Sequence, residues 1–551
     1  MAKIVIVGGV AGGASAAARL RRLDERAEII LFERGEYISF ANCGLPYYIG
    51  GTITDKDELL LQTPESFYER FRVDVRVSQE VLSINRSSRN VVVKNLGTGE
   101  TYTESYDTLI LAPGAEPMVP QIEGIHSDKI FTLRSLRDAL RIKEYIAAAG
   151  PASAVVVGGG SIGVEITENL RDAGLEVFLV EMFNQIVPPV DYEMICAVHR
   201  HIRQKGVRLI LNNKVKSLAE EGGALRVFLD EGELRSDMLI MAAGVRPEGG
   251  LAGAAGLALN ERGCIIVGPD MRTSDPAIYA LGDAAEVTGF VSGKKEFSPL
   301  AGPANKQGRI VADNICGLNA LYAGTQGSAI LKIFDMTVAM TGMNERTAKK
   351  LAYDYDKSYT YSPSHAGYYP GAENMAIKII YQKKDGRLLG AQVVGFDGVD
   401  KRCDVLAVAI RAGMTIFDLT RLELCYAPPY SSARDPVNIA GFAAENIMTG
   451  KVRVFHWHDV DALPKDGSAT LLDVRTAEEY ARGTIPGFMN MPLDHIRDRI
   501  KELDTGKPVY VICRIGLRGY IAARILSQNG FEVYNLSGGF ALYNSVFGST
   551  A

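Results

Sequence analysis

One cysteine near the N-terminus stands alone in a setting suited to redox chemistry. Cys43 lies within the stretch Ser-Phe-Ala-Asn-Cys-Gly-Leu-Pro-Tyr-Tyr at residues 39–48, and the next cysteine along the chain is Cys196. Without a nearby resolving thiol, Cys43 cannot store two electrons as an internal disulfide. Its oxidised form must therefore be a mixed disulfide with a small thiol or a sulfenic acid, and each form predicts a different substrate.

A glycine-rich turn ahead of Cys43 indicates a nucleotide site. A predicted strand at residues 4–7 runs into a glycine-rich turn and a helix of small residues, and the next predicted strand, residues 29–32, ends on an acid. Such glycines let a pyrophosphate approach the helix N-terminus, and an acid about 20 residues later can accept from a ribose hydroxyl. Val10 departs from the GxGxxG pattern, so a plain strand-to-helix turn stays an alternative for this copy. The predicted binding residues are Gly8, Gly9, Ala11, Gly12, Gly13 and Glu33.

A second copy of this pattern is complete. A predicted strand at residues 154–157 leads into a full GxGxxG, and the strand at residues 177–180 ends on Glu181. A redox enzyme needs two nucleotide sites when a hydride passes from a pyridine nucleotide to a flavin. Glu181 would accept from the 2′-hydroxyl of NADH and repel the phosphate of NADPH, so NADH is favoured and NADPH is the alternative. The predicted residues here are Gly158, Gly160, Gly163 and Glu181.

A third signal is the pair Gly282 and Asp283 at the end of a predicted strand. This arrangement can aim a carboxylate at a ribityl hydroxyl, and the dipole of the next helix then points toward the flavin. The pair is therefore a candidate FAD contact, although Gly-Asp also occurs in ordinary turns.

These signals, in this order, resemble the flavoprotein disulfide reductases with two dinucleotide-binding domains. The resemblance implies an α/β fold with two Rossmann-like domains, an α+β dimerisation domain and a homodimer. The implied boundaries are an FAD-binding domain at 1–110 with 266–320, an NAD(P)H-binding domain with connecting segments at 111–265, and a dimerisation domain at 321–446.

Two departures narrow the choice within that superfamily. The CxxxxC pair of its glutathione and lipoamide reductases is missing, and Ala11 stands where its NADH peroxidases and oxidases carry a histidine. Without that acid/base, peroxide chemistry lacks its proton donor. The context of Cys43 resembles the coenzyme A disulfide reductase family, in which the partner thiol is CoA.

A basic helix face fits a large anionic thiol. Ser15, Arg19 and Arg22 are spaced i, i+4 and i+7, so they share one face of the helix after the first glycine turn. That face could hold phosphates, and a merely solvated charged face is the alternative. The resemblance implies CoA contacts at Ser15, Arg19, Arg22, Ser39 and Asn42.

The same resemblance assigns residues in the dimerisation domain. It implies that Tyr368 and Tyr426 reach across the dimer to Cys43 of the other subunit, where they position or protonate the leaving thiolate, and that Arg434 contacts CoA. Ordinary interface packing is the alternative for both tyrosines. His365 is interpreted as structural.

A new α/β pattern follows a linker at residues 447–455. Cys513 lies between a predicted buried strand and a helix, in a loop whose N–H groups and arginines would stabilise a thiolate that accepts sulfane sulfur. Residues 456–551 resemble a single rhodanese domain with an Asp-Val-Arg motif at 473–475; Thr484 departs from the usual histidine. The predicted loop residues are Cys513, Arg514, Gly516 and Arg518. Two histidines flank Trp457 without a third ligand at metal spacing, so no metal is expected.

Composition sets the outer limits. The chain has 551 residues, enough for three to five domains, with 60 basic and 65 acidic residues and a net charge of −5. No basic block indicates nucleic acid. Seven scattered cysteines indicate a reducing compartment. No apolar run approaches the roughly 20 residues of a membrane span, and no signal peptide precedes the first strand. We expect a cytoplasmic protein that binds neither nucleic acid nor membrane.

Together the two parts resemble fusions of coenzyme A disulfide reductase with rhodanese, also described as NADH-dependent persulfide reductases. The resemblance implies an FAD-dependent NAD(P)H oxidoreductase that reduces CoA disulfide, CoA persulfide or polysulfide through Cys43, while the rhodanese domain handles sulfane sulfur. Two alternatives stay open. One is an NADH peroxidase or oxidase using a Cys43 sulfenic acid, and the other is a sulfurtransferase with a redox-sensing flavoprotein module.

Overall fold

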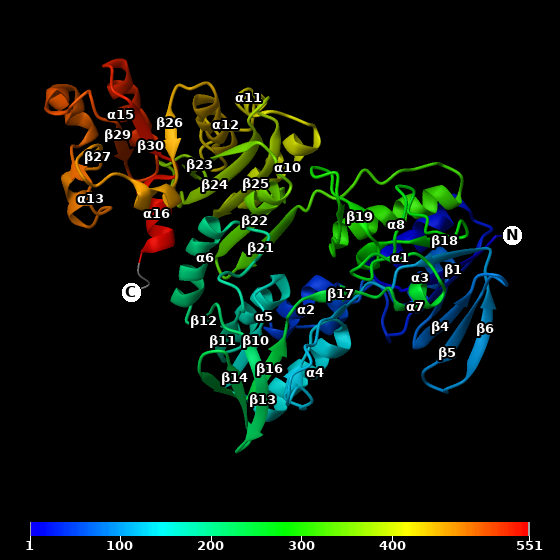
Figure 1. The fold of residues 1–551 in the computed structure, drawn as a ribbon. Helices are drawn as coiled ribbons and strands as arrows, with labels where there is room; N and C mark the ends of the chain where they lie inside the picture. Colours follow the sequence, from blue (N-terminus) through cyan, green and yellow to red (C-terminus); the bar gives the residue numbers. More distant parts are fainter. Residues whose placement is uncertain (1, 549–551) are drawn as a thin grey trace. The chain divides into compact units, whose positions relative to one another are not determined.

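The computed structural model describes residues 2–548 and divides the chain into two compact units (Figure 1). The first unit comprises Met1–Ile186 and Gly206–Thr325, and the second comprises Val187–Lys205 and Gln326–Ala551. Each unit contains two sheets of five strands. Within the described residues, no helix is long and apolar enough to cross a membrane.

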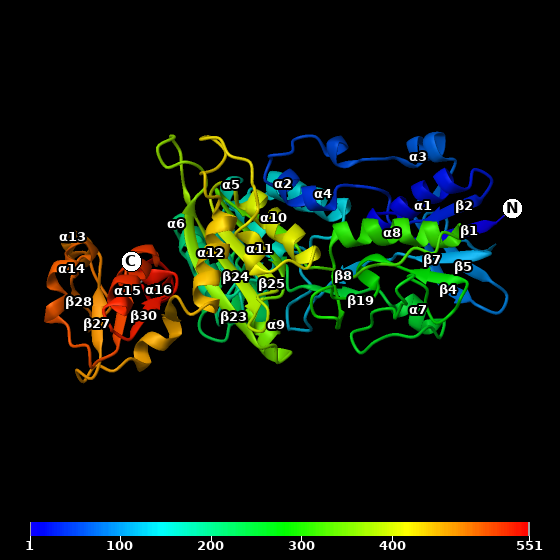
Figure 2. The same cartoon turned by 90° about the horizontal axis from the view of Figure 1, so that it is seen from above.

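The first sheet of unit 1 is parallel and carries the first glycine turn. Its strand order is β18-β7-β1-β2-β3, and the central strand is buried on both faces because Ile4, Val5 and Ile6 are at most 1% exposed. Helices α1 (Ala11–Leu23) and α8 (Ala301–Ile315) lie side by side (Figure 1, Figure 2). A Cβ at Gly308 would lie 2.5 Å from the Gly12 oxygen, so glycine permits this approach. The strands are β1 (Lys3–Val7), β2 (Glu28–Phe32), β3 (Asp74–Arg76), β7 (Thr108–Leu111) and β18 (Ile278–Ala280).

The second sheet of unit 1 repeats this plan. It is also parallel, in the order β12-β11-β10-β16-β9, and helix α5 (Ser161–Asp172) follows its central strand. Helix α4 (Leu136–Ala149) and helix α2 (Leu45–Ile49) are in contact. The strands are β9 (Ile130–Phe131), β10 (Ser153–Val157), β11 (Glu176–Val180), β12 (Arg208–Ile210) and β16 (Met238–Met241). Two three-stranded antiparallel sheets accompany them: β4 (Gln79–Asn85), β5 (Asn90–Asn95) and β6 (Thr101–Ser105), then β13 (Val215–Glu221), β14 (Ala224–Leu229) and β15 (Glu233–Ser236).

Unit 2 begins with an antiparallel sheet in the order β21-β22-β25-β24-β23. Helices α10 (Val399–Arg411) and α12 (Pro436–Met448) pack on it, and helix α6 (Tyr192–Gln204) belongs to this unit although it follows the second glycine turn in sequence. The strands are β21 (Ala329–Ile333), β22 (Met336–Gly342), β23 (Tyr355–Pro363), β24 (Asn374–Gln382) and β25 (Leu388–Gly395).

The second sheet of unit 2 is parallel, in the order β26-β30-β29-β27-β28. Helix α15 (Leu517–Gln528) follows β29, and helix α16 (Gly539–Phe547) follows β30. The strands are β26 (Arg453–Phe455), β27 (Thr470–Asp473), β28 (Met489–Asn490), β29 (Val509–Ile512) and β30 (Val533–Leu536). The predicted fold class, two Rossmann-like domains, an α+β domain and a final α/β domain, is confirmed.

Candidate active site

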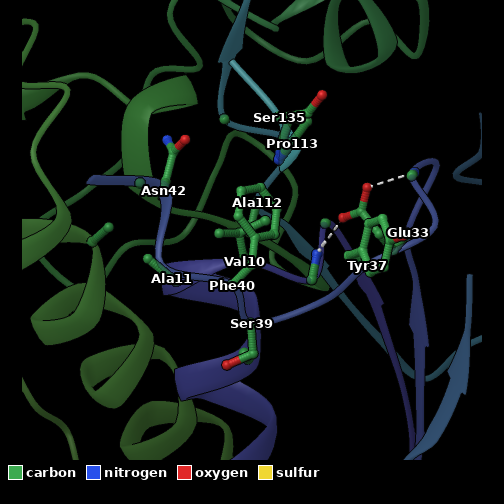
Figure 3. A pocket seen from close by; sticks show the side chains of 18 of the residues that line it. Val10, Ala11, Glu33, Tyr37, Ser39, Phe40, Asn42, Ala112, Pro113 and Ser135 are labelled. Carbon is green, nitrogen blue, oxygen red and sulfur yellow. Dashed lines mark hydrogen bonds between the residues drawn. The ribbon is translucent and has the colours of Figure 1, made fainter. Parts of the chain in front are cut away.

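The first glycine turn is a preformed cradle. Gly8 has a φ of +100°, and a Cβ there would lie 2.1 Å from the Ala112 oxygen. The Glu33 carboxylate closes the loop because Oε2 accepts from the Gly9 N–H at 2.8 Å and Oε1 accepts from the Gly35 N–H at 2.7 Å (Figure 3). A carboxylate has about four acceptor positions, so Glu33 retains capacity for a ribose hydroxyl.

The second glycine turn has the same construction. Gly158 has a φ of +107°, and a Cβ at Gly163 would lie 1.9 Å from the Gly158 oxygen. Glu181 accepts from the Gly159 N–H at 2.7 Å and from the Phe183 N–H at 2.9 Å. Both turns therefore present a helix N-terminus without side chains in the way, which is what a dinucleotide pyrophosphate requires. The chain fits two dinucleotides.

Most of the predicted flavin and CoA residues line one cavity of about 1450 Å³ in unit 1. Tyr37, Phe40, Pro113 and Ser135 also line it, and Figure 3 shows them around its wall. Gly13 lies outside the lining because it packs beneath the turn, where a Cβ would lie 1.9 Å from the Gly8 oxygen. The predicted residues in the lining are Gly8, Gly9, Ala11, Gly12, Ser15, Arg19, Arg22, Glu33, Ser39, Asn42, Cys43, Gly282 and Asp283.

Cys43 opens into this cavity as an exposed free thiol. It lies in the short turn Asn42–Gly44 directly before α2. Although the side chain reaches the cavity, the surrounding protein removes much of its hydration, and this desolvation raises the pKa of the thiol. The negative charges of Glu165 and Asp283 raise it further. The apoprotein therefore holds Cys43 mainly protonated at neutral pH, and thiolate chemistry requires a compensating positive charge or dipole.

Glu165 is one residue in this region that the sequence analysis missed. It lies on α5, two residues after the second GxGxxG, and burial raises the pKa of its carboxyl to about 7, with the nearby Glu168 adding to the shift. It also contributes to raising the pKa of Tyr47 to about 12. The position could have been marked from the sequence, but its burial beside α2 is a tertiary fact.

Asn42 and Ser39 are held by backbone and side-chain contacts. With its amide oriented to satisfy both atoms, Asn42 donates to the Arg134 carbonyl at 2.9 Å and accepts from Arg134 Nη1 at 2.8 Å. Arg134 Nε also donates to the Ala115 carbonyl at 2.6 Å. The Ser39 N–H donates to the Gly9 carbonyl at 2.9 Å. The loop before Cys43 is thus tied to the glycine turn and to β8 (Ala115–Pro117).

The predicted phosphate face on α1 is partly engaged with α8. Ser15 donates to Asn305, and Arg19 pairs with Asp313 at 2.8 Å. Arg22 is exposed at the cavity edge. Arg22 is therefore the member of this face best placed to meet an incoming phosphate.

Unit 2 brings the two predicted tyrosines together. The Tyr368 and Tyr426 hydroxyls lie 2.9 Å apart, and the side chains are 76% and 49% exposed. The hydrogen bond raises the pKa of Tyr368. Arg434 is exposed, whereas His365 is buried between Ser364 and the Pro370 carbonyl.

Cys513 lies at the base of its loop and is fully buried. The Gly516 N–H donates to its sulfur at 3.1 Å, and Gly516 has a φ of +96° that lets the loop curl over the thiol. Burial raises the pKa of Cys513 and outweighs the N–H groups of Gly519, Ile515 and Gly516, which favour the thiolate. The loop therefore combines N–H groups that favour the thiolate with burial that opposes it.

Ion pairs fix the side chains of Arg475 and Arg518 in this domain. Arg518 pairs with both oxygens of Glu479 at 2.6 and 2.7 Å, and Arg475 donates to Asp473 at 2.7 Å. Thr484 donates to the same Asp473 oxygen at 2.7 Å. At this position the hydroxyl therefore contributes to packing of the Asp-Val-Arg motif. Arg514 is exposed beside the loop.

Three family models match the chain. The pyridine nucleotide-disulphide oxidoreductase model matches residues 2–308, its dimerisation-domain model matches 328–437, and a rhodanese-like domain model matches 456–545. The chain belongs to the pyridine nucleotide-disulphide oxidoreductase family and carries a rhodanese-like domain. It is an oxidoreductase enzyme, and this family implies FAD and a pyridine nucleotide as cofactors, as predicted.

Individual relatives are similar over most of the chain. A coenzyme A disulfide reductase of Staphylococcus epidermidis is 36% identical over 447 residues, covering 81% of this chain and 100% of the relative. The crystal structure of reduced Bacillus anthracis CoADR-RHD is 53% identical, with a TM-score of 0.97 over 99% of this chain and 98% of that one. The NAD-dependent persulfide reductase from A. fulgidus is 39% identical, with a TM-score of 0.92 over 98% of this chain and 100% of that one. The predicted resemblance is confirmed.

Proposed function

We propose that this enzyme reduces CoA disulfide, CoA persulfide or a polysulfide with NADH, through a mixed disulfide between Cys43 and CoA. The observation that carries this proposal is a lone, exposed thiol in a cavity that also contains the first glycine cradle and Arg22. A thiol without a resolving cysteine in reach needs an external partner. The relatives named for CoA disulfide and persulfide support CoA as that partner.

The residues assigned to each ligand follow the sequence analysis. The first cradle with Glu33, Gly282 and Asp283 would hold FAD, and the second cradle with Glu181 would hold NADH. Ser15, Arg19, Arg22, Ser39 and Asn42 would hold CoA, with Arg434 of a second copy. When bound, FAD and NADH supply two electrons for the reduction of sulfur. We further propose a homodimer, which the matched dimerisation domain supports, and we propose that it is cytoplasmic.

Cys43 carries the sulfur chemistry. Its thiolate attacks one sulfur of CoA disulfide, a bond forms between Cys43 and that CoA, and the other CoA leaves as a thiolate. Two electrons and one proton then cleave the mixed disulfide and return the Cys43 thiolate and CoA thiol. With CoA persulfide, attack at the CoA sulfur releases hydrosulfide instead. Tyr368 and Tyr426 of the other copy protonate or position the departing thiolate.

The rhodanese-like domain supplies sulfane sulfur. Cys513 takes the outer sulfur of a persulfide donor, becomes a persulfide itself and releases the donor as a thiol. CoA thiol then takes that sulfur, which regenerates Cys513 and forms CoA persulfide for Cys43. Arg514 and Arg518 contribute positive potential around the loop. The two halves thus share CoA as a common carrier.

Mass spectrometry of the untreated protein tests the central step. We expect a reducible adduct with the mass of CoA on the Cys43 peptide, and we expect Cys43→Ser to abolish NADH-dependent reduction of CoA disulfide. Cys513→Ser should retain that activity and turnover with CoA persulfide, and it should lose turnover with other persulfide donors. A Cys43 sulfenic acid with rapid peroxide consumption would contradict the proposal. So would a protein whose main activity survives Cys43→Ser, because that result favours a sulfurtransferase.

A further inference from the structure

The phenols of Tyr368 and Tyr426 come from two separate loops of unit 2. The first, residues 364–370, connects β23 to β24, and the second, residues 425–431, lies between α11 (Ile416–Leu419) and α12. We call them the tyrosine loops. They share one backbone hydrogen bond, from the Ala366 N–H to the Pro428 carbonyl at 3.2 Å. Tyr368 is largely exposed and Tyr426 is half-exposed, so the positions of the phenols depend mainly on the loop backbones.

A single buried guanidinium joins the two loops from below. Arg402 on α10 is 1% exposed, and its Nη2 donates to the Ser364 carbonyl at 2.9 Å. The same nitrogen lies 3.1 Å from the Ser431 hydroxyl and 3.4 Å from the Tyr430 carbonyl of the second loop. The first carbonyl begins one tyrosine loop, and the second lies near the end of the other. Each is four residues from its tyrosine along the chain, 364 to 368 and 430 to 426.

A carboxylate fixes the guanidinium in turn. Asp435 Oδ2 accepts from Arg402 Nη2 at 3.0 Å and from the Ser431 hydroxyl at 2.8 Å, while Oδ1 accepts from the Val437 N–H at the start of α12. Arg402 Nη1 also donates to the Gly398 carbonyl at 3.3 Å. The planar fork is therefore held between two helices, and it can present its donors to the loops in only one orientation.

Stability alone does not account for this arrangement. Burying an ion pair costs desolvation energy that well-packed apolar residues would avoid, so a buried pair is weak evidence for stability. Here it positions two carbonyls on separate loops. Lysine could supply the charge but could not present the fork.

We infer that Arg402 is the positioning residue that holds the Tyr368 and Tyr426 phenols at hydrogen-bond distance. One phenol donates within the pair, which leaves the hydroxyl hydrogen of the other free to donate to a departing thiolate. This role rests on the proposed function, in which those phenols serve the Cys43 chemistry of a second copy.

The test compares Arg402→Lys with Lys401→Met. Lys401 is the neighbour on α10, and its ammonium lies 3.8 Å from the same Asp435 carboxylate, so it is a matched control. We expect Arg402→Lys to lower the turnover of CoA disulfide about 10- to 100-fold, the cost of misplacing a catalytic group. FAD content and the rate of flavin reduction by NADH should be unchanged, and Lys401→Met should behave as the wild type.

A double-mutant cycle separates positioning from general damage. If Arg402 acts through the phenols, Arg402→Lys adds little to the loss already caused by Tyr368→Phe with Tyr426→Phe. An additive loss would overturn the inference. Thermal unfolding identifies any misfolded variant, in which case Asp435→Asn replaces it, because that change loosens the fork while leaving Arg402 in place.

Titration of the phenols tests the inference without an activity assay. The difference in phenolate absorbance between the wild type and Tyr368→Phe reports the pair, and the pKa of Tyr368 is raised there by its hydrogen bond. In Arg402→Lys that pKa should return toward about 10, and a pKa that stays raised would overturn the inference. If it returns while the Tyr→Phe variants keep full turnover, the positioning role stands and the catalytic assignment of the phenols fails.

Discussion

The carboxyl of Glu165 should control the reactivity of Cys43 in the physiological pH range. Burial raises its pKa to about 7, and its negative charge is one of the causes that raise the pKa of Cys43. The negative charge of Asp283 also raises the pKa of Cys43. Burial raises the pKa of Asp283 itself, and the positive charge of Arg134 opposes that rise. Tyr47, with a pKa of about 12, does not ionise in this range. Glu165→Gln removes a nearby charge that changes between pH 6 and pH 8.

The size of the effect follows from coupled titration. One nearby charge shifts a pKa by about one unit, and a group with a pKa of about 7 is about one-tenth ionised at pH 6 and about nine-tenths at pH 8. With those values, the Cys43 thiolate fraction in Glu165→Gln exceeds the wild-type fraction by about 10% at pH 6, about twofold at pH 7 and about fivefold at pH 8.

Alkylation of Cys43 measures this directly. The reduced, CoA-free enzyme is treated with iodoacetamide, and the modified Cys43 peptide is followed by mass spectrometry between pH 6 and pH 8. Glu144→Gln, which changes an exposed glutamate of α4, is the control. A rate ratio that does not change with pH, or a slower reaction in Glu165→Gln, would refute the reasoning.

Two further changes test other parts of the molecule. Lys378 is completely buried, and its ammonium lies 2.5–2.8 Å from Asp191, Glu193 and Glu345. Lys378→Met should destabilise unit 2 by about 3–5 kcal/mol because it leaves buried carboxylates unpaired. In the wild type Lys378 depresses the pKa of Glu193, so this stabilisation is present above the unfolded pKa of about 4.3 and is lost as pH falls. The deficit of the variant in thermal unfolding should therefore shrink in acid, and a deficit independent of pH would contradict this. Glu181→Ser should raise the KM for NADH and lower that for NADPH about tenfold, the loss of roughly 1.4 kcal/mol of discrimination; unchanged KM values would show that Glu181 does not face the ribose.

The sequence predicted those features whose chemistry depends on local spacing. The two glycine turns, Cys43 and the Cys513 loop each lie within a short stretch, and their geometry follows from backbone rules that hold in any fold. Glu165, Arg134 and Arg402 could not be found in this way. Each acquires its role from a partner distant in sequence, as Arg134 does from Asn42. The sequence alone does not distinguish such residues from ordinary surface glutamates and arginines.

The buried ammonium of Lys378 illustrates the same limit. Asp191, Glu193 and Glu345 lie close enough together to hold a metal ion. Lys378 Nζ contacts all three, so the positive charge such a cluster requires is already covalently part of the chain. In the sequence alone, Asp191 just before α6, Glu193 in α6 and Glu345 in α9 (Glu345–Lys350) carry no sign of that pairing.

Glu33 and Glu181 have a consequence for how nucleotides arrive. Because each carboxylate already braces its own glycine turn through two backbone N–H groups, the cradles keep their shape when empty. An incoming dinucleotide then spends little of its affinity on ordering the loop. If FAD is removed from this protein, it should rebind to a site that is already formed. The oxidised nicotinamide nucleotide can likewise dissociate without any unfolding of the loop.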